Sequence, residues 1–170
     1  MRQVKVMTAE PLIRRIIEAA NAAKLDMIII GNAAAALQGS PISTLDIDFY
    51  VRDVERKMPK IRALAERLGA VVVRADSAMS RMVKIENEVE GVFLDLLDRP
   101  TGMSSFASVR RRATELSFTG CRSRVYVASM GDVISSKRSL GRPKDLAVLP
   151  LLEATLHEQE RMSQQGETGY

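Results

Sequence analysis

The pattern that most constrains the fold is the alternation of apolar and polar residues over residues 45–51, which reads LDIDFYV. Successive side chains of a β-strand point to opposite faces. The segment therefore predicts a strand with one apolar face and with Asp46 and Asp48 together on the other. The two carboxylates would lie roughly 6–7 Å apart along the strand and repel each other unless a cation bridges them. The alternative is a sheet with one solvated face.

A third carboxylate, Asp95, lies inside the apolar run of residues 92–97. A buried carboxylate without a partner costs several kcal/mol, so this side chain needs either a cation or a chemical task. A salt bridge to a nearby arginine is the alternative. The neighbouring Asp98 precedes Arg99 and Pro100, a pattern typical of a turn that ends a strand, and we interpret Asp98 as structural.

The apolar residues 28–30 are followed by Gly31, Asn32 and four alanines. This order predicts a buried strand, a glycine turn and a short helix, whose first N–H groups are free to bind an anion. Many α/β turns share this order, so the segment alone does not define a site.

Taken together, these segments resemble the DNA polymerase β-like nucleotidyltransferase superfamily. The pattern of that family is a hydrophobic residue, Gly, then Gly or Ser, a gap of about a dozen residues, and Asp-x-Asp or Asp-x-Glu between hydrophobic residues. Here Gly31 and Asn32 precede the Asp46–Asp48 pair. Residues 39–44, which end at Thr44, and residues 136–146 are similar to the small bacterial members, including type IV toxins and related minimal nucleotidyltransferases. The resemblance covers about residues 27–152.

The resemblance implies that Asp46 and Asp48 hold Mg²⁺, or Mn²⁺, against the phosphates of a nucleoside triphosphate (NTP). Asp95 would complete a second metal site and help to activate the acceptor hydroxyl. These three aspartates are the expected catalytic and metal-binding residues. Oxygen ligands suit a hard ion such as Mg²⁺.

For the nucleotide, the resemblance implies binding through Gly31, Asn32, Thr44, Lys137 and Arg142. Gly31 would let its backbone approach the phosphates, and Lys137 would contact the triphosphate or the base side. The basic residues around position 140 could equally form a solvated face. There are two departures from the family pattern: Asn32 replaces Gly or Ser, and Ile42 stands where relatives often carry Arg.

The function implied by the resemblance is transfer of a nucleoside monophosphate from an NTP to a hydroxyl, with release of pyrophosphate (EC 2.7.7 type). The acceptor could be RNA, a protein hydroxyl or a small molecule. The alternative is a weak or inactive nucleotide-binding module that regulates a toxin–antitoxin-like system, with an antitoxin or another helical protein as partner. Either reading implies a cytoplasmic, bacterial protein that does not enter a membrane.

The composition of the chain excludes several classes of site and of protein. One cysteine, Cys121, and one histidine, His157, leave no internal disulfide, no cysteine-cluster zinc site and no site built from several imidazoles. The longest aliphatic run, residues 27–30, is far shorter than a membrane span. Residues 99–144 hold ten basic and two acidic residues, so the positive charge of the chain is concentrated there.

Helical and strand patterns alternate along the 170 residues and then give way to helices. They predict an α/β (α+β) fold, with a mixed β-sheet nucleotidyltransferase core, flanking helices and a small C-terminal helical segment. We expect one domain over residues 1–158, with the core at about 8–128 and the C-terminal helices at about 129–158. A polar tail is expected over residues 159–170.

Overall fold

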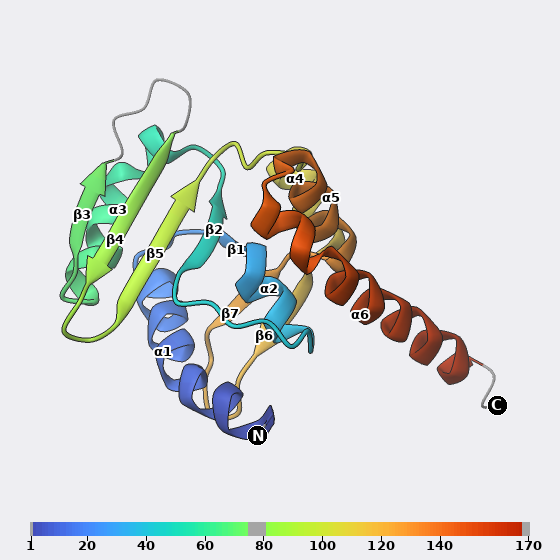
Figure 1. The fold of residues 1–170 in the computed structure, drawn as a ribbon. Coiled ribbons are helices and arrows are strands. Elements are labelled where there is room, and N and C mark those ends of the chain that lie inside the picture. Colours follow the sequence, from blue (N-terminus) through green and yellow to red (C-terminus); the bar gives the residue numbers. More distant parts are fainter. Residues whose placement is uncertain (1, 75–80, 168–170) are drawn as a thin grey trace.

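A mixed sheet of seven strands organises the chain, in the order β3-β4-β5-β2-β1-β7-β6 (Figure 1). The computed structural model describes residues 2–74 and 81–167, with side chains from Glu10 onward. The strands are β1 (Met27–Ile30), β2 (Ile47–Val51), β3 (Val71–Arg74), β4 (Met82–Asn87), β5 (Val92–Leu97), β6 (Thr114–Ser117) and β7 (Arg124–Val127). The helices are α1 (Arg2–Ala22), α2 (Gly31–Leu37), α3 (Val54–Arg67), α4 (Phe106–Arg112), α5 (Met130–Leu140) and α6 (Pro143–Glu167).

Strands β5, β2 and β1 lie at the centre of the sheet. The pairs β1–β7 and β2–β5 are parallel, whereas β1–β2, β3–β4, β4–β5 and β6–β7 are antiparallel. All four residues of β1 are buried, as expected for a short apolar run inside a sheet. Because β2 lies between β1 and β5, its polar side chains are brought close to residues from both neighbours.

Helices cover the two faces of the sheet unequally. Helices α1 and α3 contact each other and pack along one face, where α1 meets β7 and α3 meets β3 and β4. Helix α2 packs on β1, β2 and α5, and α5 packs on α6. Figure 1 shows α2, α5 and α6 beside the β1 and β7 half of the sheet. No described helix covers the face of β3, β4 and β5 that is opposite to α3, and we call it the open face. The alternate side chains of β5 on that open face, such as Phe93, are accordingly only half-buried.

The predicted α+β fold with a mixed sheet is confirmed, but some element boundaries were wrong. Strand β2 begins at Ile47, and residues 45 and 46 form a bend before it. Leu45 is 86% exposed and does not share the apolar face of the strand. The segment expected to be a polar tail is polar, but helix α6 runs through it to Glu167. Residues 168–170 lie outside the described residues. Helix α1 begins at Arg2.

Asp98 has the structural role predicted for it. It is buried, and its Oδ2 accepts a hydrogen bond from the backbone N–H of Val54, 3.1 Å away, at the start of α3. Arg81 approaches the same oxygen at 3.9 Å. A negative side chain at a helix N-terminus satisfies an N–H group that has no partner within the helix. No helix in the described ranges combines the length and apolarity that a membrane crossing would need.

The turn after β5 is fastened to α5 by a close backbone approach at Gly102. Ser135 Oγ donates to the carbonyl of Gly102 at 2.8 Å, and Ser136 Oγ donates to that of Thr101 at 2.7 Å. Gly102 has φ +73°, and a Cβ there would lie 2.5 Å from Ser139 Oγ and 2.8 Å from the carbonyl oxygen of Ser135. Only glycine fits this contact, which locks α5 to the end of β5.

We therefore expect Gly102→Ala to destabilise the protein more than Gly91→Ala. Gly91 has a nearly equal φ of +69°, but a Cβ there would meet nothing within 4 Å. Both changes incur the left-handed backbone penalty of about 1–2 kcal/mol. Only Gly102→Ala adds a clash, worth about a further 1–3 kcal/mol. Urea unfolding of the two variants measures the difference, and equal losses would contradict the close approach.

Candidate active site

Asp48 is the centre of the candidate site. It lies in β2, opposite Ile30 of β1 on one side and Asp95 of β5 on the other. No salt bridge is recorded for it among the described residues. Burial raises the pKa of Asp48 to about 6, and the charges of Asp95 and Asp46 raise it as well, whereas Lys137 and Lys84 lower it. A carboxylate buried beside two like charges favours a cation as its partner.

Gly31 makes room for this carboxylate. It has φ +64°, and a Cβ at this position would lie 2.7 Å from Asp48 Oδ2. An L side chain would therefore be strained by the backbone and would collide with the carboxylate. Helix α2 starts at Gly31, so the glycine that makes room for the carboxylate is also the first residue of this short helix. The strand–glycine–helix order in the sequence and the aspartate strand are thus parts of one site.

Asp95 lies beside Asp48 and on the open face of the sheet. Its side chain is 18% exposed, and its Oδ1 lies 3.4 Å from Nζ of Lys84 on β4. Its cationic partner is therefore a half-exposed lysine on the adjacent strand and not the buried arginine that the sequence left open as an alternative. The sequence pattern did not single out Lys84, although it occupies an alternate position of a strand next to β5.

Asp46 is placed differently from the other two aspartates. It is exposed at the bend before β2, yet its charge still acts on Asp48. Thr44 Oγ1 donates to the carbonyl oxygen of Asp46 at 2.7 Å, so Thr44 holds the bend that carries Asp46. Among the described residues no three acidic, histidine or cysteine side chains are gathered closely enough to enclose a metal ion. Asp48 and Asp95 lie side by side on neighbouring strands, whereas Asp46 lies in the bend before β2.

Asn32, the departure from the family pattern, follows Gly31 and its side-chain oxygen is buried without a hydrogen-bond partner among the described residues. Amide oxygen and nitrogen can exchange places by a flip of the side chain. The flipped amide would direct an N–H donor to the same spot, which suits an anionic oxygen. The replacement of Gly or Ser by Asn is therefore compatible with a phosphate at this turn.

Two cations approach Asp48 from the C-terminal helices. Lys137 on α5 forms a salt bridge with Asp145 at 3.4 Å, and Arg142, which precedes α6, bonds the same carboxylate at 2.6 Å. Asp145 is fully buried, and its pKa is held below the usual value by the hydrogen bond from Arg142 and by the charge of Lys137. The charge of Asp48 in turn contributes to the raised pKa of Arg142. Asp145 thus holds both cations near the carboxylates.

Sequence analysis had assigned Asp145 only to the favourable N-terminus of a helix. Its burial and its two partners show a larger role, which could have been suspected from the Arg142-x-x-Asp145 spacing across the helix start. The glycine at 141 has φ +62° and ends α5, so that the chain turns back and brings Asp145 under Lys137. Lys137 and Arg142 are therefore held together by Asp145, and their contact with a nucleotide stays a prediction.

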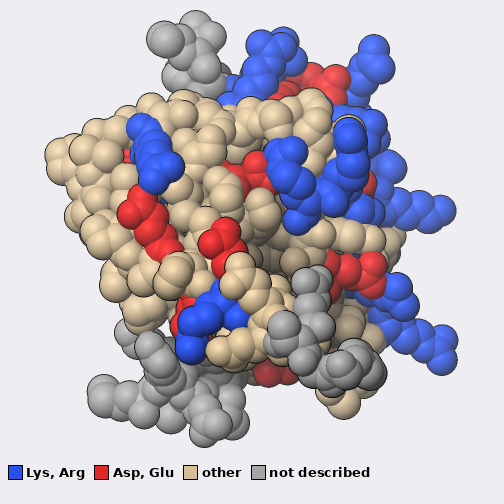
Figure 2. Space-filling view, turned by 90° about the vertical axis from the view of Figure 1, so that its right-hand side faces the viewer, with Lys and Arg blue, Asp and Glu red and all other residues tan. Residues whose placement is uncertain are grey.

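The basic stretch 99–144 does not form one free positive surface. Five of its ten basic residues are in ion pairs, namely Arg112 with Asp132, Arg124 with Glu115, Lys137 and Arg142 with Asp145, and Arg138 with Glu153. Figure 2 shows lysines and arginines gathered over the upper part of the side on which α6 lies, with acidic side chains set between them. Much of the positive charge of this stretch is therefore balanced by acidic partners.

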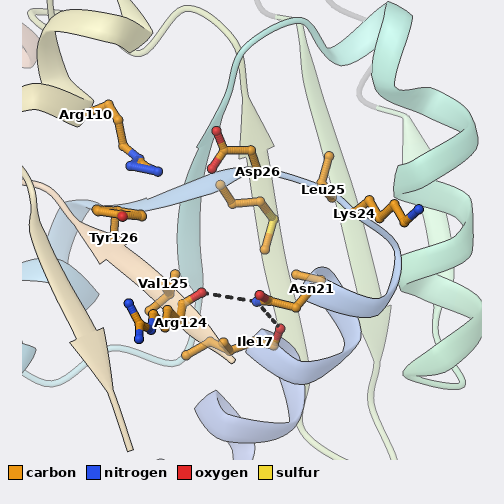
Figure 3. A pocket seen from close by; sticks show the side chains of 11 residues that line it. Ile17, Asn21, Lys24, Leu25, Asp26, Arg110, Arg124, Val125 and Tyr126 are labelled. Atoms are coloured by element: carbon orange, nitrogen blue, oxygen red, sulfur yellow. Dashed lines mark hydrogen bonds between the residues drawn. The ribbon is translucent and has the colours of Figure 1, made fainter. Parts of the chain in front are cut away.

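A hollow of 280 Å³ lies elsewhere, near the start of β1 (Figure 3). It is lined by α1, β1, α4 and β7, with Arg110 over the ring of Tyr126 and with Asp26 between basic side chains. Asn21 closes one side by donating to the carbonyls of Ile17 and Arg124 at 2.8 and 3.1 Å. The predicted site residues do not line it, because Gly31 follows the opposite end of β1.

Three solved structures share this fold. The crystal structure of ANT(2")-Ia in complex with adenylyl-2"-tobramycin has a TM-score of 0.58 at 20% identity, covering 90% of this chain and 92% of that one. The solution structure of the antibiotic-resistance factor ANT(2'')-Ia gives 0.56 at 17% identity, over 100% of both chains. A Thermotoga maritima protein assigned as a nucleotidyltransferase gives 0.60 at 17% identity, over 84% and 91%.

The chain has the fold of nucleotidyltransferases. At these identities the likeness concerns the fold, and it confirms the architecture expected from the sequence resemblance. No protein-family model and no curated protein matches the sequence. The roles of the individual residues therefore depend on the geometry of the site described above.

Without metal, Asp48 should make the protein less stable as the pH rises. Its carboxyl titrates near 3.8 when unfolded and near 6 when folded, so the folded state binds the proton more tightly. The free energy of unfolding then falls across this interval, and the loss is complete above pH 6. As the pH rises from 3.8 to above 6, we expect Asp48→Asn in EDTA to become more stable than wild type by about 1–3 kcal/mol.

Thermal melts of both proteins across this pH range measure the effect. Asp26→Asn, a change of an exposed aspartate at the other end of β1, is the matched control and should follow wild type. If the gap between Asp48→Asn and wild type does not widen with pH, Asp48 is not the buried, unpaired carboxylate described here.

Proposed function

We propose that this chain is a metal-dependent nucleotidyltransferase, which moves a nucleoside monophosphate from an NTP to a hydroxyl and releases pyrophosphate. The observation that carries the proposal is the Asp48–Asp95 pair in register on β2 and β5, with the partly buried Asp48 carboxylate against Gly31 and, among the described residues, in no salt bridge. The fold shared with nucleotidyltransferases supports the reaction class.

The residues present fit a divalent metal. The donors are carboxylate oxygens, which suit Mg²⁺ or Mn²⁺, and the pKa of Asp48 is raised first by burial and then by the charge of Asp95, both of which a bound cation would offset. Asp48 and Asp95 would hold the metal from the sheet, and Asp46 would join them from the exposed bend before β2. When bound, the metal supplies positive charge that neutralises the triphosphate and the developing charge of the reaction.

The chain itself would bind and orient the nucleotide. Lys137 and Arg142, held by Asp145, would contact the β- and γ-phosphates, while the backbone at Gly31 and the amide of Asn32 would contact them from the opposite side. Pairing with Asp145 fixes the direction of both cations before substrate arrives, which reduces the entropy lost on binding. Thr44 would act indirectly by holding the bend that carries Asp46.

In the transfer step, the acceptor oxygen forms a bond to the α-phosphorus while the bond between the α-phosphorus and the bridging oxygen breaks. The electron pair of that bond leaves with pyrophosphate. Asp95, on the open face of the sheet, would take the proton of the acceptor hydroxyl. Catalysis in this arrangement comes mainly from positioning and from charge stabilisation.

The open face of β3, β4 and β5 is the side from which an acceptor would reach Asp95. The candidate acceptors are RNA, a protein hydroxyl and a small molecule. Among small molecules we include an aminoglycoside, because one structure with this fold holds adenylyl-2"-tobramycin. A chain that binds NTP and releases no pyrophosphate with any of them would instead be a nucleotide-binding regulatory module. Pyrophosphate release from mixed NTPs, measured with each acceptor class, separates the two functions.

Removing any of the three carboxylates should abolish turnover. We expect Asp46→Asn, Asp48→Asn and Asp95→Asn each to lose metal-dependent pyrophosphate release while keeping the wild-type circular dichroism spectrum, because each loses an oxygen ligand for the metal. Asp26→Asn should keep full activity. Full activity of Asp48→Asn would show that the metal is not held at this strand.

Lys137→Ala should weaken NTP binding by about 1–3 kcal/mol, the range of a charge-assisted hydrogen bond. Asp145→Asn should act in the same direction, since it frees Lys137 and Arg142 from their fixed positions. A nucleoside monophosphate should be much less affected, and Lys57→Ala on α3 is the control. Calorimetric titration with ATP and AMP is the measurement. Equal losses for the two nucleotides would place Lys137 away from the terminal phosphates.

A further inference from the structure

Lys84 is a charge at the site that neither the sequence pattern nor the proposed reaction accounts for. Direct cross-strand pairing places Val73, Lys84, Asp95 and Asp48 in one row on the open face of the sheet. In a sheet, directly paired residues project to the same face, so Lys84 and Asp48 flank the Asp95 carboxylate from opposite sides. The Nζ of Lys84 lies 3.4 Å from Asp95 Oδ1.

The two lysines near the carboxylates are held very differently. The side chain of Lys137 is 12% exposed and is fixed by the buried Asp145, which is 1% exposed. The side chain of Lys84 is 36% exposed, and Asp95 is its recorded partner among the described residues. An exposed ion pair of this kind contributes little to stability, so its long, flexible side chain can leave without a large penalty.

Lys84 also occupies an oxygen that a metal would need. The ammonium group and a divalent cation would compete for Asp95 Oδ1, and the repulsion between them forbids both from occupying it together. A single positive charge on Lys84 lowers the repulsion between Asp95 and Asp48 but does not remove it, as the raised pKa of Asp48 shows. A divalent ion would neutralise the pair more completely.

We propose that Lys84 is a built-in, displaceable counter-ion of Asp95, which keeps the second carboxylate closed to free metal until a metal–triphosphate complex arrives. This inference rests on the proposed function and adds to it a regulation of the same site. A free metal ion must displace Lys84 with its own affinity alone. A metal–triphosphate complex also gains the contacts of Lys137 and Arg142, which offset the displacement. The site therefore favours metal that enters with the nucleotide over metal that enters alone.

The alternative is that Lys84 only strengthens the pairing of β4 with β5. Both roles predict a small loss of stability in EDTA when the charge is removed. They differ in metal affinity, because a residue that only supports the sheet does not compete for the metal. Metal binding by the protein without nucleotide is therefore the readout that decides between the roles.

The test is titration of the full chain with Mn²⁺ alone, followed by electron paramagnetic resonance of free Mn²⁺. Lys84→Gln should bind Mn²⁺ roughly tenfold more tightly than wild type, since a competing charge a few ångströms from the site is gone. Lys84→Arg, which keeps the charge, and Lys57→Gln on the opposite side of the sheet should bind like wild type. With ATP present, the advantage of Lys84→Gln should shrink.

Asp48→Asn separates failure of this inference from failure of the proposed site. If Asp48→Asn abolishes Mn²⁺ binding but Lys84→Gln binds as wild type or more weakly, Lys84 is not a competing counter-ion, although the metal site stands. If Asp48→Asn binds Mn²⁺ as wild type does, or if neither wild type nor Lys84→Gln binds it, the metal site and this inference are both overturned. Melts in EDTA confirm that each variant is folded.

Discussion

The site depends on one constraint: the Asp48 carboxylate lies within the sheet and forms no salt bridge among the described residues. A charge in such a position is destabilised by burial and by its neighbours Asp95 and Asp46, and burial is the larger cause of its raised pKa. The residues around Asp48 accommodate that charge. Gly31 gives it space, and the charges of Lys137 and Lys84 lower its pKa without restoring the ordinary value. An unneutralised carboxylate held this way is suited to a metal ion.

The arrangement of the cations follows from the same constraint. Cations fixed too tightly to Asp48 and Asp95 would exclude a metal, and cations held too loosely would not orient a triphosphate. The chain resolves this conflict by tying Lys137 and Arg142 to a different carboxylate, Asp145, and by leaving Lys84 in a half-exposed pair. The Gly102 contact fastens α5, which carries Lys137, to the turn that follows β5, the strand of Asp95. The nucleotide side and the carboxylate side are thereby connected through the backbone.

The concentration of positive charge between residues 99 and 144 takes on a different meaning in the folded chain. From composition alone it could indicate a broad surface for a polyanion. In the structure half of these basic residues are paired with acids that lie between 3 and 20 residues away in the sequence, such as Arg138 with Glu153. The field that reaches the carboxylates comes from a few oriented groups. A broad basic surface is not needed for the proposed chemistry, in which the phosphates are bound from two sides at short range.

Local patterns in the sequence determined the elements that depend on local interactions. The apolar run of β1, the glycine that starts α2 and the Ser129 cap of α5 were predictable, because side chains a few residues apart decide them. The aspartates 46, 48 and 95 were identified because carboxylates are conspicuous among apolar neighbours. Sequence could not show that β2 begins only at Ile47, since the bend before it depends on hydrogen bonds such as that from Thr44.

Tertiary structure alone decided which charges meet. Lys84 faces Asp95 because β4 pairs with β5 in one register, and a shift of one residue would have turned it to the other face. Asp145 became the anchor of Lys137 and Arg142 because α6 folds back on α5. Electrostatic interactions act through space between residues far apart in the chain, so their partners follow from packing. The sequence by itself determined the donors of the site, and the fold determined their order, burial and counter-ions.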